Sequence, residues 1–350
     1  NTTGTHNTAL GDTSLAANTT TNHCTAVGQG SLQQNTAANN TAVGSASLNA
    51  NTTGYSNVAV GYLAGTNITT GYENTVVGKS ALAAATTGQK ATAIGFGAFA
   101  NMTTGGNSVA VGWECGSAMT TGLYNVFVGH ETGHDLTTGQ YNTAVGYLAQ
   151  DTGNTSYTVS VGSGAHGGGS GTMTGNENTA VGHNASHNLT GGVRNTVIGC
   201  NANDTSTTGN DNITIGYNAD PPSNSSEGNC TLGDSSISNL RCNDTSISSL
   251  SDRRDKIDIV DLPIGLDFIN TIRPVKFKWQ TRDGNVKDGK VRAGFIAQEL
   301  QSAEEGIDYL NLVMDDNPEK LEAKEQHLFP VMVQAIKELS AQNEALVARI

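Results

Sequence analysis

The sequence predicts a mainly β protein, in which a parallel β-solenoid is followed by a small α+β domain. A branched aliphatic residue followed by glycine recurs fourteen times in the first two thirds of the chain, almost always 17 residues apart. The segment around this pair alternates apolar and polar residues and is rich in β-branched ones, which is typical of a strand. After about residue 234 the repeat stops and the sequence becomes charged and helix-capable.

The glycines of the repeat define its period. They are Gly11, Gly28, Gly44, Gly61, Gly78, Gly95, Gly112, Gly129, Gly146, Gly162, Gly182, Gly199, Gly216 and Gly233. Of the thirteen intervals between them, ten are 17 residues long, two are 16 and one is 20. This period is too short for a helical hairpin and suits one turn of a β-solenoid. Fourteen turns at about 4.8 Å each predict a rod roughly 65 to 70 Å long.

The residues around each glycine predict how a turn is packed. The preceding residue is always Leu, Val or Ile, and we expect it to stack in a continuous core. The third residue after the glycine is always small, so we expect that site to be crowded. Asn occupies the fourth position before the glycine in ten turns, which predicts amide hydrogen bonds from turn to turn. Thr-Thr-Gly corners, such as those ending at Gly54 and Gly71, predict a positive φ at the glycine.

Each turn offers only a few small aliphatic residues, so a single coil has a thin core. We therefore expect several chains to associate along the rod. The strand motif, for example Asn-Thr-Ala-Val-Gly at 40–44, resembles the head of trimeric bacterial adhesins, whose turns carry a similar Ser-Val-Ala-Ile-Gly strand. That resemblance implies a left-handed β-roll and a homotrimer.

Charge and composition exclude several classes of protein. Residues 1–250 hold 4 Lys or Arg against 13 Asp or Glu, and residues 251–350 hold 14 against 18, for a net charge of −13. Nucleic acid is an unsuitable partner for so acidic a surface. No run of eighteen apolar residues exists, so we expect no membrane insertion. The composition divides the chain into a shaft (1–234), a neck (235–250) and a second domain (251–350).

Three motifs follow one another in the last hundred residues. They are Leu-Ser-Asp-Arg-Arg-Asp-Lys at 250–256, Ile-Arg-Pro-Val-Lys-Phe-Lys-Trp at 272–279 and Gly-Phe-Ile-Ala-Gln-Glu-Leu at 294–300. Together they resemble the intramolecular chaperone of phage tail spikes and fibres, the endosialidase-type chaperone or S74 peptidase family. The resemblance covers most of residues 250–350. It implies a module that assists folding and trimerisation of the preceding fibre and then cuts itself off.

The same resemblance implies a catalytic Ser-Lys dyad. Ser251 would be the nucleophile and Lys256 the base, with cleavage between Leu250 and Ser251. A hydroxyl is a weak nucleophile until a base removes its proton, and a lysine can do so only if its pKa is lowered. Burial or a cation such as Arg254 would lower the pKa of Lys256, whereas Asp252 would raise it.

The end of the chain has a heptad pattern. Its apolar seam consists of Met332, Ile336, Leu339, Asn343, Leu346 and Ile350. This spacing predicts a coiled coil in which Asn343 helps to determine register and oligomeric state. Packing of the helix onto its own domain explains the first half of the seam equally well.

Two features of the shaft could bind ligands. His-Glu-Thr-Gly-His at 130–134 matches the zinc-protease motif, but it lies in a β repeat and contains a glycine, so we expect no metal site there and no cofactor. Aromatic residues follow the repeat glycine in several turns, at Tyr62, Phe96, Trp113 and Tyr147. They predict either packing between chains or a receptor-binding or sugar-binding stripe. No paired carboxylates suggest a glycosidase.

These observations favour a virion protein, a homotrimeric tail fibre that contacts a host-cell receptor or glycan. Its chaperone domain would act once as a self-cleaving serine peptidase and would be released in the host cytoplasm during assembly. One alternative is a cellular trimeric surface adhesin, which would need a membrane anchor. Another is an ice-binding solenoid, which would need regular Thr-x-Thr ladders on one flat face, whereas the Thr-Thr-Gly pairs fall at corners.

Overall fold

The computed structural model describes residues 1–167, 169, 171–237, 239–241, 251–280, 289–319 and 321–350. By its internal contacts the chain divides into two units, Asn1–Asp234 and Ser235–Ile350. Within the described ranges, no helix is both long and apolar enough to cross a membrane.

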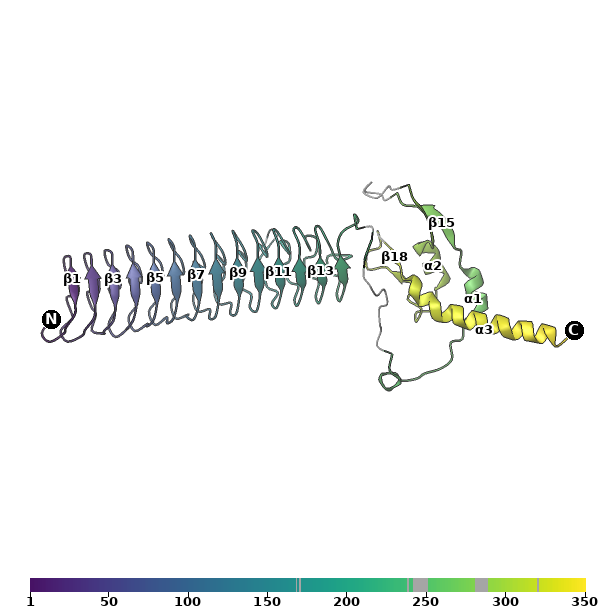
Figure 1. Cartoon of the computed structure of the whole chain (residues 1–350), viewed down its shortest axis with the longest axis horizontal. Coiled ribbons are helices and arrows are strands. Elements are labelled where there is room, and N and C mark those ends of the chain that lie inside the picture. The colour runs from purple at the N-terminus through teal and green to yellow at the C-terminus, as the bar shows by residue number, and fades with distance from the viewer. Residues whose placement is uncertain (168, 170, 238, 242–250, 281–288, 320) are drawn as a thin grey trace. The chain divides into compact units, whose positions relative to one another are not determined.

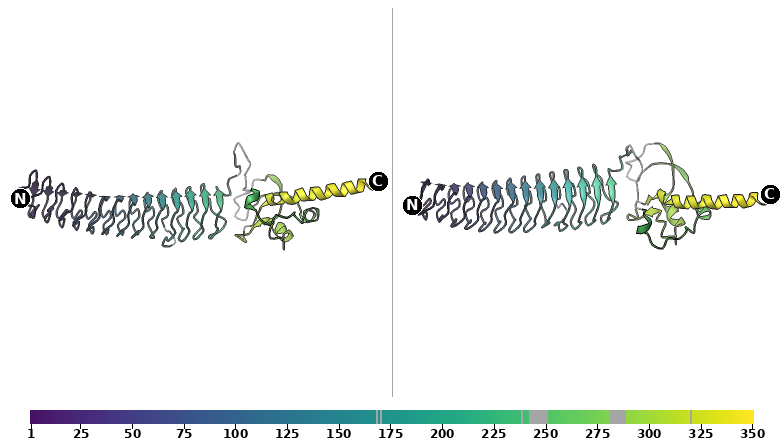
Figure 2. Two further views of the ribbon diagram at one scale, coloured as in Figure 1. Left: turned by 90° about the horizontal axis from the view of Figure 1, so that it is seen from below. Right: turned by 60° about the horizontal axis from the view of Figure 1, so that its bottom comes forward.

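The first unit is a parallel β-solenoid with one three-residue strand in each turn (Figure 1). Its fourteen strands form one parallel sheet in chain order, so the predicted fold class is confirmed, with thirteen complete turns between the first and last strand. Neighbouring strands pair in register, as Val43 does with Val60. The strands are β1 Thr8–Leu10, β2 Thr25–Val27, β3 Thr41–Val43, β4 Val58–Val60, β5 Thr75–Val77, β6 Thr92–Ile94, β7 Val109–Val111, β8 Val126–Val128, β9 Thr143–Val145, β10 Val159–Val161, β11 Thr179–Val181, β12 Thr196–Ile198, β13 Ile213–Ile215 and β14 Cys230–Leu232. Figure 2 shows that the strands line one side of the coil, whereas the rest of each turn is irregular.

The direction of the strand side chains corrects one expectation. The middle residue of a strand, such as Ala59, is buried, while Val58 and Val60 on either side of it are exposed. The aliphatic residue before each glycine therefore lies on the outside of the coil, and the prediction that it forms the core was wrong. Successive side chains of a strand point to opposite faces. When the middle residue of a three-residue strand points into the coil, the first and third therefore point outward.

Small and large side chains share the interior of the coil. The middle strand positions are mostly Ala, and the crowded position three residues after the glycine is buried and small, as predicted, for example at Ala64 and Ala98. Larger side chains enter from the irregular part of the turn, among them Leu32, Leu82 and Phe99. Their volume explains why the strand contributes only a small residue to the core.

The predicted asparagine ladder is present and buried. The side-chain oxygen of Asn57 accepts a hydrogen bond from the backbone N–H of Asn74 at 3.0 Å. Its amide nitrogen donates to the carbonyl oxygen of Gly71 at 2.8 Å. The same two bonds recur elsewhere, for example around Asn195. Each asparagine thus satisfies two backbone groups that the irregular corner would leave unpaired in the interior.

Glycine has two different roles in a turn. The repeat glycine has a φ of +147° at Gly112, and a Cβ there would lie 1.9 Å from the carbonyl oxygen of Gly129. The Thr-Thr-Gly glycines were expected to have positive φ, and this was wrong, because Gly54 and Gly71 are absent from the left-handed region. A Cβ on Gly54 would instead meet the carbonyl oxygen of Gly71 at 2.1 Å, so glycine is required there by the close approach of the next turn.

The second unit is a small domain of helices and two antiparallel hairpins, as the sequence predicted. Its core contains Phe268, Leu300, Leu310, Leu312, Val313, Leu328 and Val331. Strand β15 pairs with β16, and β17 pairs with β18. The elements are the 3₁₀ helix η1 Arg253–Asp255, α1 Leu266–Thr271, β15 Val275–Lys278, β16 Val291–Gly294, α2 Ala297–Ala303, β17 Val313–Met314, β18 Glu322–Ala323, η2 Glu325–His327 and α3 Leu328–Val347.

Helix α3 packs onto its own unit through a different face from the heptad seam. Leu328, Val331 and Ala335 are buried, and a carboxylate oxygen of Glu338 accepts a hydrogen bond from the backbone N–H of Leu266 at the start of α1. The seam residues are exposed, with 65% of the side chain accessible at Ile336. Packing within the domain therefore does not account for the seam, even in its first half.

Candidate functional site

A single turn of 3₁₀ helix, η1, brings Ser251 and Lys256 together. Asp252 caps this turn by accepting a hydrogen bond from the backbone N–H of Arg254 at 2.8 Å. The backbone N–H of Lys256 then donates to the carbonyl oxygen of Arg253 at 3.2 Å. Because the chain reverses over these residues, side chains that are five positions apart in the sequence end on the same side of the turn.

The two side chains of the predicted dyad are in direct contact. Lys256 Nζ donates a hydrogen bond to Ser251 Oγ at 2.6 Å. This is the separation that proton transfer between a hydroxyl and its base requires. Both residues are exposed to solvent in the single chain. The described residues of the single chain therefore leave the dyad open to water.

The neighbouring charges pair with each other. Arg254 forms an ion pair with Asp252, with Nη2 and Oδ2 2.6 Å apart. The Arg254 guanidinium lowers the pKa of the Asp252 carboxyl through this side-chain hydrogen bond. An unpaired carboxylate beside Ser251 would stabilise the charged form of Lys256. Pairing with Arg254 offsets that effect, so Arg254 favours the dyad by neutralising Asp252.

The predicted scissile bond is only partly described. Ser251 is the first described residue after the gap at 242–250, so Leu250 and the bond between Leu250 and Ser251 lie outside the described residues.

An ion pair connects the second and third motifs of the domain. The guanidinium of Arg273, just before β15, bonds both carboxylate oxygens of Glu299 on α2, one of them through Nε at 3.1 Å. The Arg273 guanidinium lowers the pKa of the Glu299 carboxyl. No local pattern assigns Glu299 a role, because its partner lies 26 residues away and outside α2. This pair joins α2 to the segment between α1 and β15.

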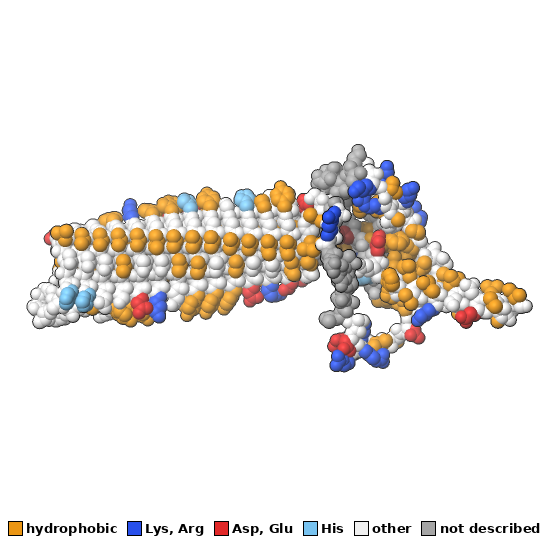
Figure 3. Space-filling view, viewed as in Figure 1, with side chains coloured by type: hydrophobic (Ala, Val, Ile, Leu, Met, Phe, Trp, Pro, Cys, Tyr) orange, Lys and Arg blue, Asp and Glu red, His pale blue; other side chains and the backbone are white. Residues whose placement is uncertain are grey.

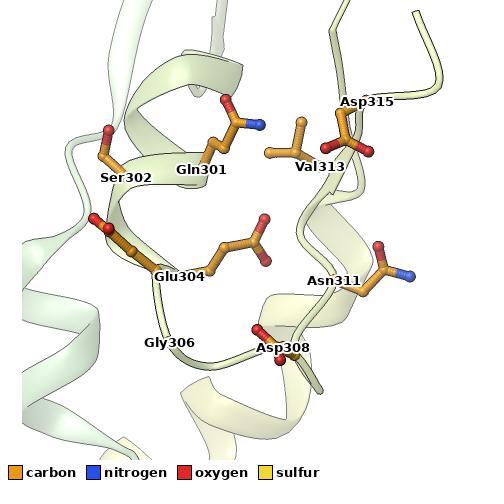
Figure 4. Close-up of a pocket in the computed structure, with 9 residues that line it drawn as sticks. Gln301, Ser302, Glu304, Gly306, Asp308, Asn311, Val313 and Asp315 are labelled. Atoms are coloured by element: carbon orange, nitrogen blue, oxygen red, sulfur yellow. The ribbon is translucent and has the colours of Figure 1, made fainter. Parts of the chain in front are cut away.

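The same unit contains an open acidic cavity of about 540 Å³ between the end of α2 and β17 (Figure 4). Sequence analysis did not find it. Glu304 at its wall is already engaged, because Oε2 accepts the backbone N–H of Leu312 at 2.6 Å. The lining residues are Gln301, Ser302, Glu304, Glu305, Gly306, Asp308, Asn311, Val313 and Asp315.

On the shaft, the predicted aromatic stripe is a stack of exposed rings. Phe96 and Trp113 lie 5.9 Å apart between centroids, and Trp113 and His130 lie 4.7 Å apart. Tyr147 continues the stack from His130 at 5.4 Å, while Tyr62 is exposed earlier in the same column. Since stacked rings cover one another's faces, the stripe presents mainly ring edges to its surroundings.

A second aromatic stack was missed by sequence analysis. Tyr124, Tyr141 and Tyr157 stack at 4.9 and 5.1 Å on the corner five residues before the repeat glycine. The column holds other residue types in most turns, for instance Glu73 and Lys90, so no aromatic pattern runs along it. What the positions of this column share is a left-handed backbone conformation, which the residue types do not reveal.

The two histidines of the zinc-protease motif have separate partners. His130 stacks on Trp113, whereas His134 Nδ1 lies 2.9 Å from a carboxylate oxygen of Asp135. In the described part of the chain, no three His, Cys, Asp or Glu residues are placed to hold a metal ion.

The first threonine of a Thr-Thr-Gly corner is half-buried and bonds to the next turn through its hydroxyl. Thr52 Oγ1 donates to the carbonyl oxygen of Thr69 at 3.0 Å, and Thr69 Oγ1 donates to that of Thr86 at the same distance. These hydroxyls therefore join neighbouring turns.

Comparison with known proteins gives one match. Residues 251–309 match the family model described as the chaperone of endosialidase, peptidase S74. The matched segment begins at Ser251 and includes Lys256, Arg273 and Glu299. No curated protein and no solved structure matches the chain.

Proposed function

We propose that residues 251–309 belong to a chaperone of endosialidase domain. This domain would fold and trimerise the solenoid and then release itself by autoproteolysis. The family match indicates a phage tail fibre-type protein with a β-solenoid shaft. The observation that carries the finer proposal is the 2.6 Å contact between Ser251 Oγ and Lys256 Nζ at the start of the matched segment. Ser251 and Lys256 would act as the catalytic dyad of a peptidase that turns over once.

The chemistry follows from the position of the nucleophile beside its own scissile bond. Neutral Lys256 takes the hydroxyl proton, and Ser251 Oγ attacks the carbonyl carbon of Leu250. The amide bond breaks, an ester forms between Leu250 and Ser251 Oγ, and Lys256 passes the proton to the freed amino group of Ser251. Water then hydrolyses the ester, which leaves a carboxylate on Leu250 and restores the hydroxyl.

Assembly would control when this reaction begins. Both side chains of the dyad are exposed to water in the single chain, and a Ser-Lys pair needs a water-excluded environment to act as nucleophile and base. Contacts made by neighbouring copies in a trimer would remove water from the dyad and so supply that environment. Release would then follow correct trimerisation rather than precede it.

Autoproteolysis is tested by expressing the full chain beside Ser251→Ala, Lys256→Ala and Lys256→Arg, and by measuring fragment masses. We expect the unmodified chain to split into 250 and 100 residues, and all three variants to stay intact. Arginine keeps the positive charge but cannot lose a proton, so it separates basicity from charge. Arg253→Ala is the matched control and should cleave. An intact unmodified chain, or cleavage of Ser251→Ala at Leu250, would disprove the dyad.

The exposed seam of α3 supports the homotrimer. Met332, Ile336, Leu339 and Leu346 form an apolar stripe that no part of the described unit covers, and Asn343 interrupts it at one position. We propose that three copies of α3 form a coiled coil that starts assembly. Native mass measurement of Ser251→Ala, which keeps the domain attached, should give three chains, and a monomer would contradict the trimer.

The shaft would remain in the virion as a host-attachment appendage, while the chaperone domain would be left in the host cytoplasm. We propose the aromatic stripe of Tyr62, Phe96, Trp113 and Tyr147 as the contact with a host receptor or glycan. Its support is the exposure of four large aromatic side chains in one column, with 52% of Tyr62 and 42% of Trp113 accessible.

A further inference from the structure

The outward side of the β-sheet carries no charged residue and has an aliphatic side chain in every strand along the whole length of the shaft. We call it the strand face and define it as the first and third residues of β1 to β14. The third residue is Leu, Val or Ile in all fourteen strands, and the first is Thr, Val, Ile or Cys. No charged residue occurs at any of these positions. In Figure 3 the hydrophobic side chains form an unbroken row along the solenoid.

These side chains are partly open to water in the single coil. Between 37% and 38% of Val43, Val60 and Ile94 is accessible, and 42% of Ile198. Thirteen spacings of about 4.8 Å and a width of 7 to 10 Å give a strip of roughly 400 to 600 Å². This area equals the largest apolar patch found on typical monomers, and patches of this kind commonly mark interaction sites.

We propose that the strand face is where the shaft meets two further copies of itself, parallel and in register, with the aliphatic residues before the glycines forming a core between chains. This inference rests on the proposed trimeric fibre. It also explains why these positions accept only branched aliphatic residues although they lie outside the coil. The residues that the sequence assigned to the core would then be core residues of the trimer rather than of one chain.

The regular spacing and the charge distribution favour copies of this chain over another partner. Every copy presents aliphatic side chains at the same interval of about 4.8 Å, so two parallel rods match along their whole length. Identical acidic chains repel one another unless the surface between them is uncharged. Charges of the shaft lie on other columns, such as the corner that carries the ion pair of Arg194 and Asp211.

Two pairs of lysine substitutions test this surface in full-length Ser251→Ala, in which the chaperone domain stays attached. Val60→Lys with Ile94→Lys places two charges on the strand face. Thr53→Lys with Thr87→Lys places two charges at exposed Thr-Thr-Gly corners of the same two turns. We expect the first pair to lower the thermal midpoint and to convert the shaft to separate rods, and the second pair to leave both unchanged. Equal behaviour of the two pairs would overturn the proposal.

Cysteine cross-linking provides a second measurement that does not depend on how well the lysine variants fold. In chains in which Cys200, Cys230 and Cys242 are replaced by serine, Val60→Cys should join copies covalently on mild oxidation, and Thr53→Cys should not. A trimer by mass in which Val60→Cys fails to cross-link would refute the strand face but leave the proposed function intact. A monomer by mass would refute both.

Discussion

Ser160 Oγ and His166 Nδ1 lie 2.8 Å apart inside the solenoid, with both side chains completely buried. Ser160 takes the middle position of a strand where its neighbours are Ala144 and Ala180. His166 takes a position that Leu32 and Leu82 fill in earlier turns. The apolar core of the shaft ends on one side of this pair and resumes on the other. A buried imidazole in this place makes the shaft sensitive to acid.

We predict that the shaft loses stability as the pH falls from about 6.5 toward 3. Burial lowers the pKa of His166 from its ordinary value of 6.5 to about 3. Between these values the unfolded chain binds a proton that the folded chain does not, so acid favours unfolding; stability is complete above pH 6.5. The loss is at most roughly 5 kcal/mol. Thermal melts followed by circular dichroism across this pH range measure it.

Ser160→Ala with His166→Leu is the matched variant, because it restores residues that other turns carry at these positions. It should melt at the same temperature at pH 4.5 and pH 7, apart from the effect of Asp151.

Burial, together with the nearby Asp135, raises the pKa of Asp151 to about 6, so acid stabilises the shaft at this residue. Asp151→Asn removes that opposing contribution. An unchanged acid response in the His166 variant would show that another group is responsible.

The sequence predicts the period of the shaft but not which side of the strand is inside. Ala59 and Val60 are adjacent and both apolar, and hydrophobicity favours the larger side chain, Val60, for the core. The structure places Val60 outside because bulky residues such as Leu48 already fill the coil. In the proposed trimer Val60 would be covered by another copy, a contact that the sequence pattern of one chain does not reveal.

The candidate site shows a similar limit. Ser251 and Lys256 are five residues apart on a polar segment, and only their resemblance to a family identifies them. Their contact depends on a 3₁₀ turn capped by Asp252, which the composition of the segment does not reveal. The pair of Arg273 and Glu299 joins residues 26 positions apart in the sequence, so no local pattern predicts it.

Removing one member of the asparagine ladder should destabilise the shaft. Asn57→Ala leaves the carbonyl oxygen of Gly71 and the backbone N–H of Asn74 buried without partners. Each orphaned group costs about 1 to 3 kcal/mol, so we expect a loss of roughly 2 to 6 kcal/mol in denaturant unfolding. The exposed Asn101→Ala should change stability by less than about 0.5 kcal/mol. Similar losses in both variants would mean that the ladder does not stabilise the coil.

The repeat glycine should be far more sensitive to substitution than a second glycine on the corner nearby. A Cβ at Gly112 would lie 1.9 Å from the carbonyl oxygen of Gly129, so Gly112→Ala must separate two turns. We expect it to cost more than about 4 kcal/mol or to prevent folding. Gly97 has a φ of +64°, which Ala46 and Leu63 also adopt at the equivalent position. Gly97→Ala should therefore cost only about 1 to 2 kcal/mol, and a comparable loss at both glycines would contradict the proposed crowding.

Receptor binding by the aromatic stripe is tested by removing two of its rings. Phe96→Ala with Trp113→Ala should lower binding of the released shaft to bacterial surface polysaccharides on a glycan array by at least about tenfold, because exposed aromatic residues supply much of the binding energy at such surfaces. Both rings are exposed, so the coil should keep its melting temperature. Tyr124→Ala with Tyr141→Ala is the matched control, since it removes an equally spaced stack from a different column. Equal loss from both double variants would assign binding to aromatic content in general, and full binding by the first would exclude the stripe.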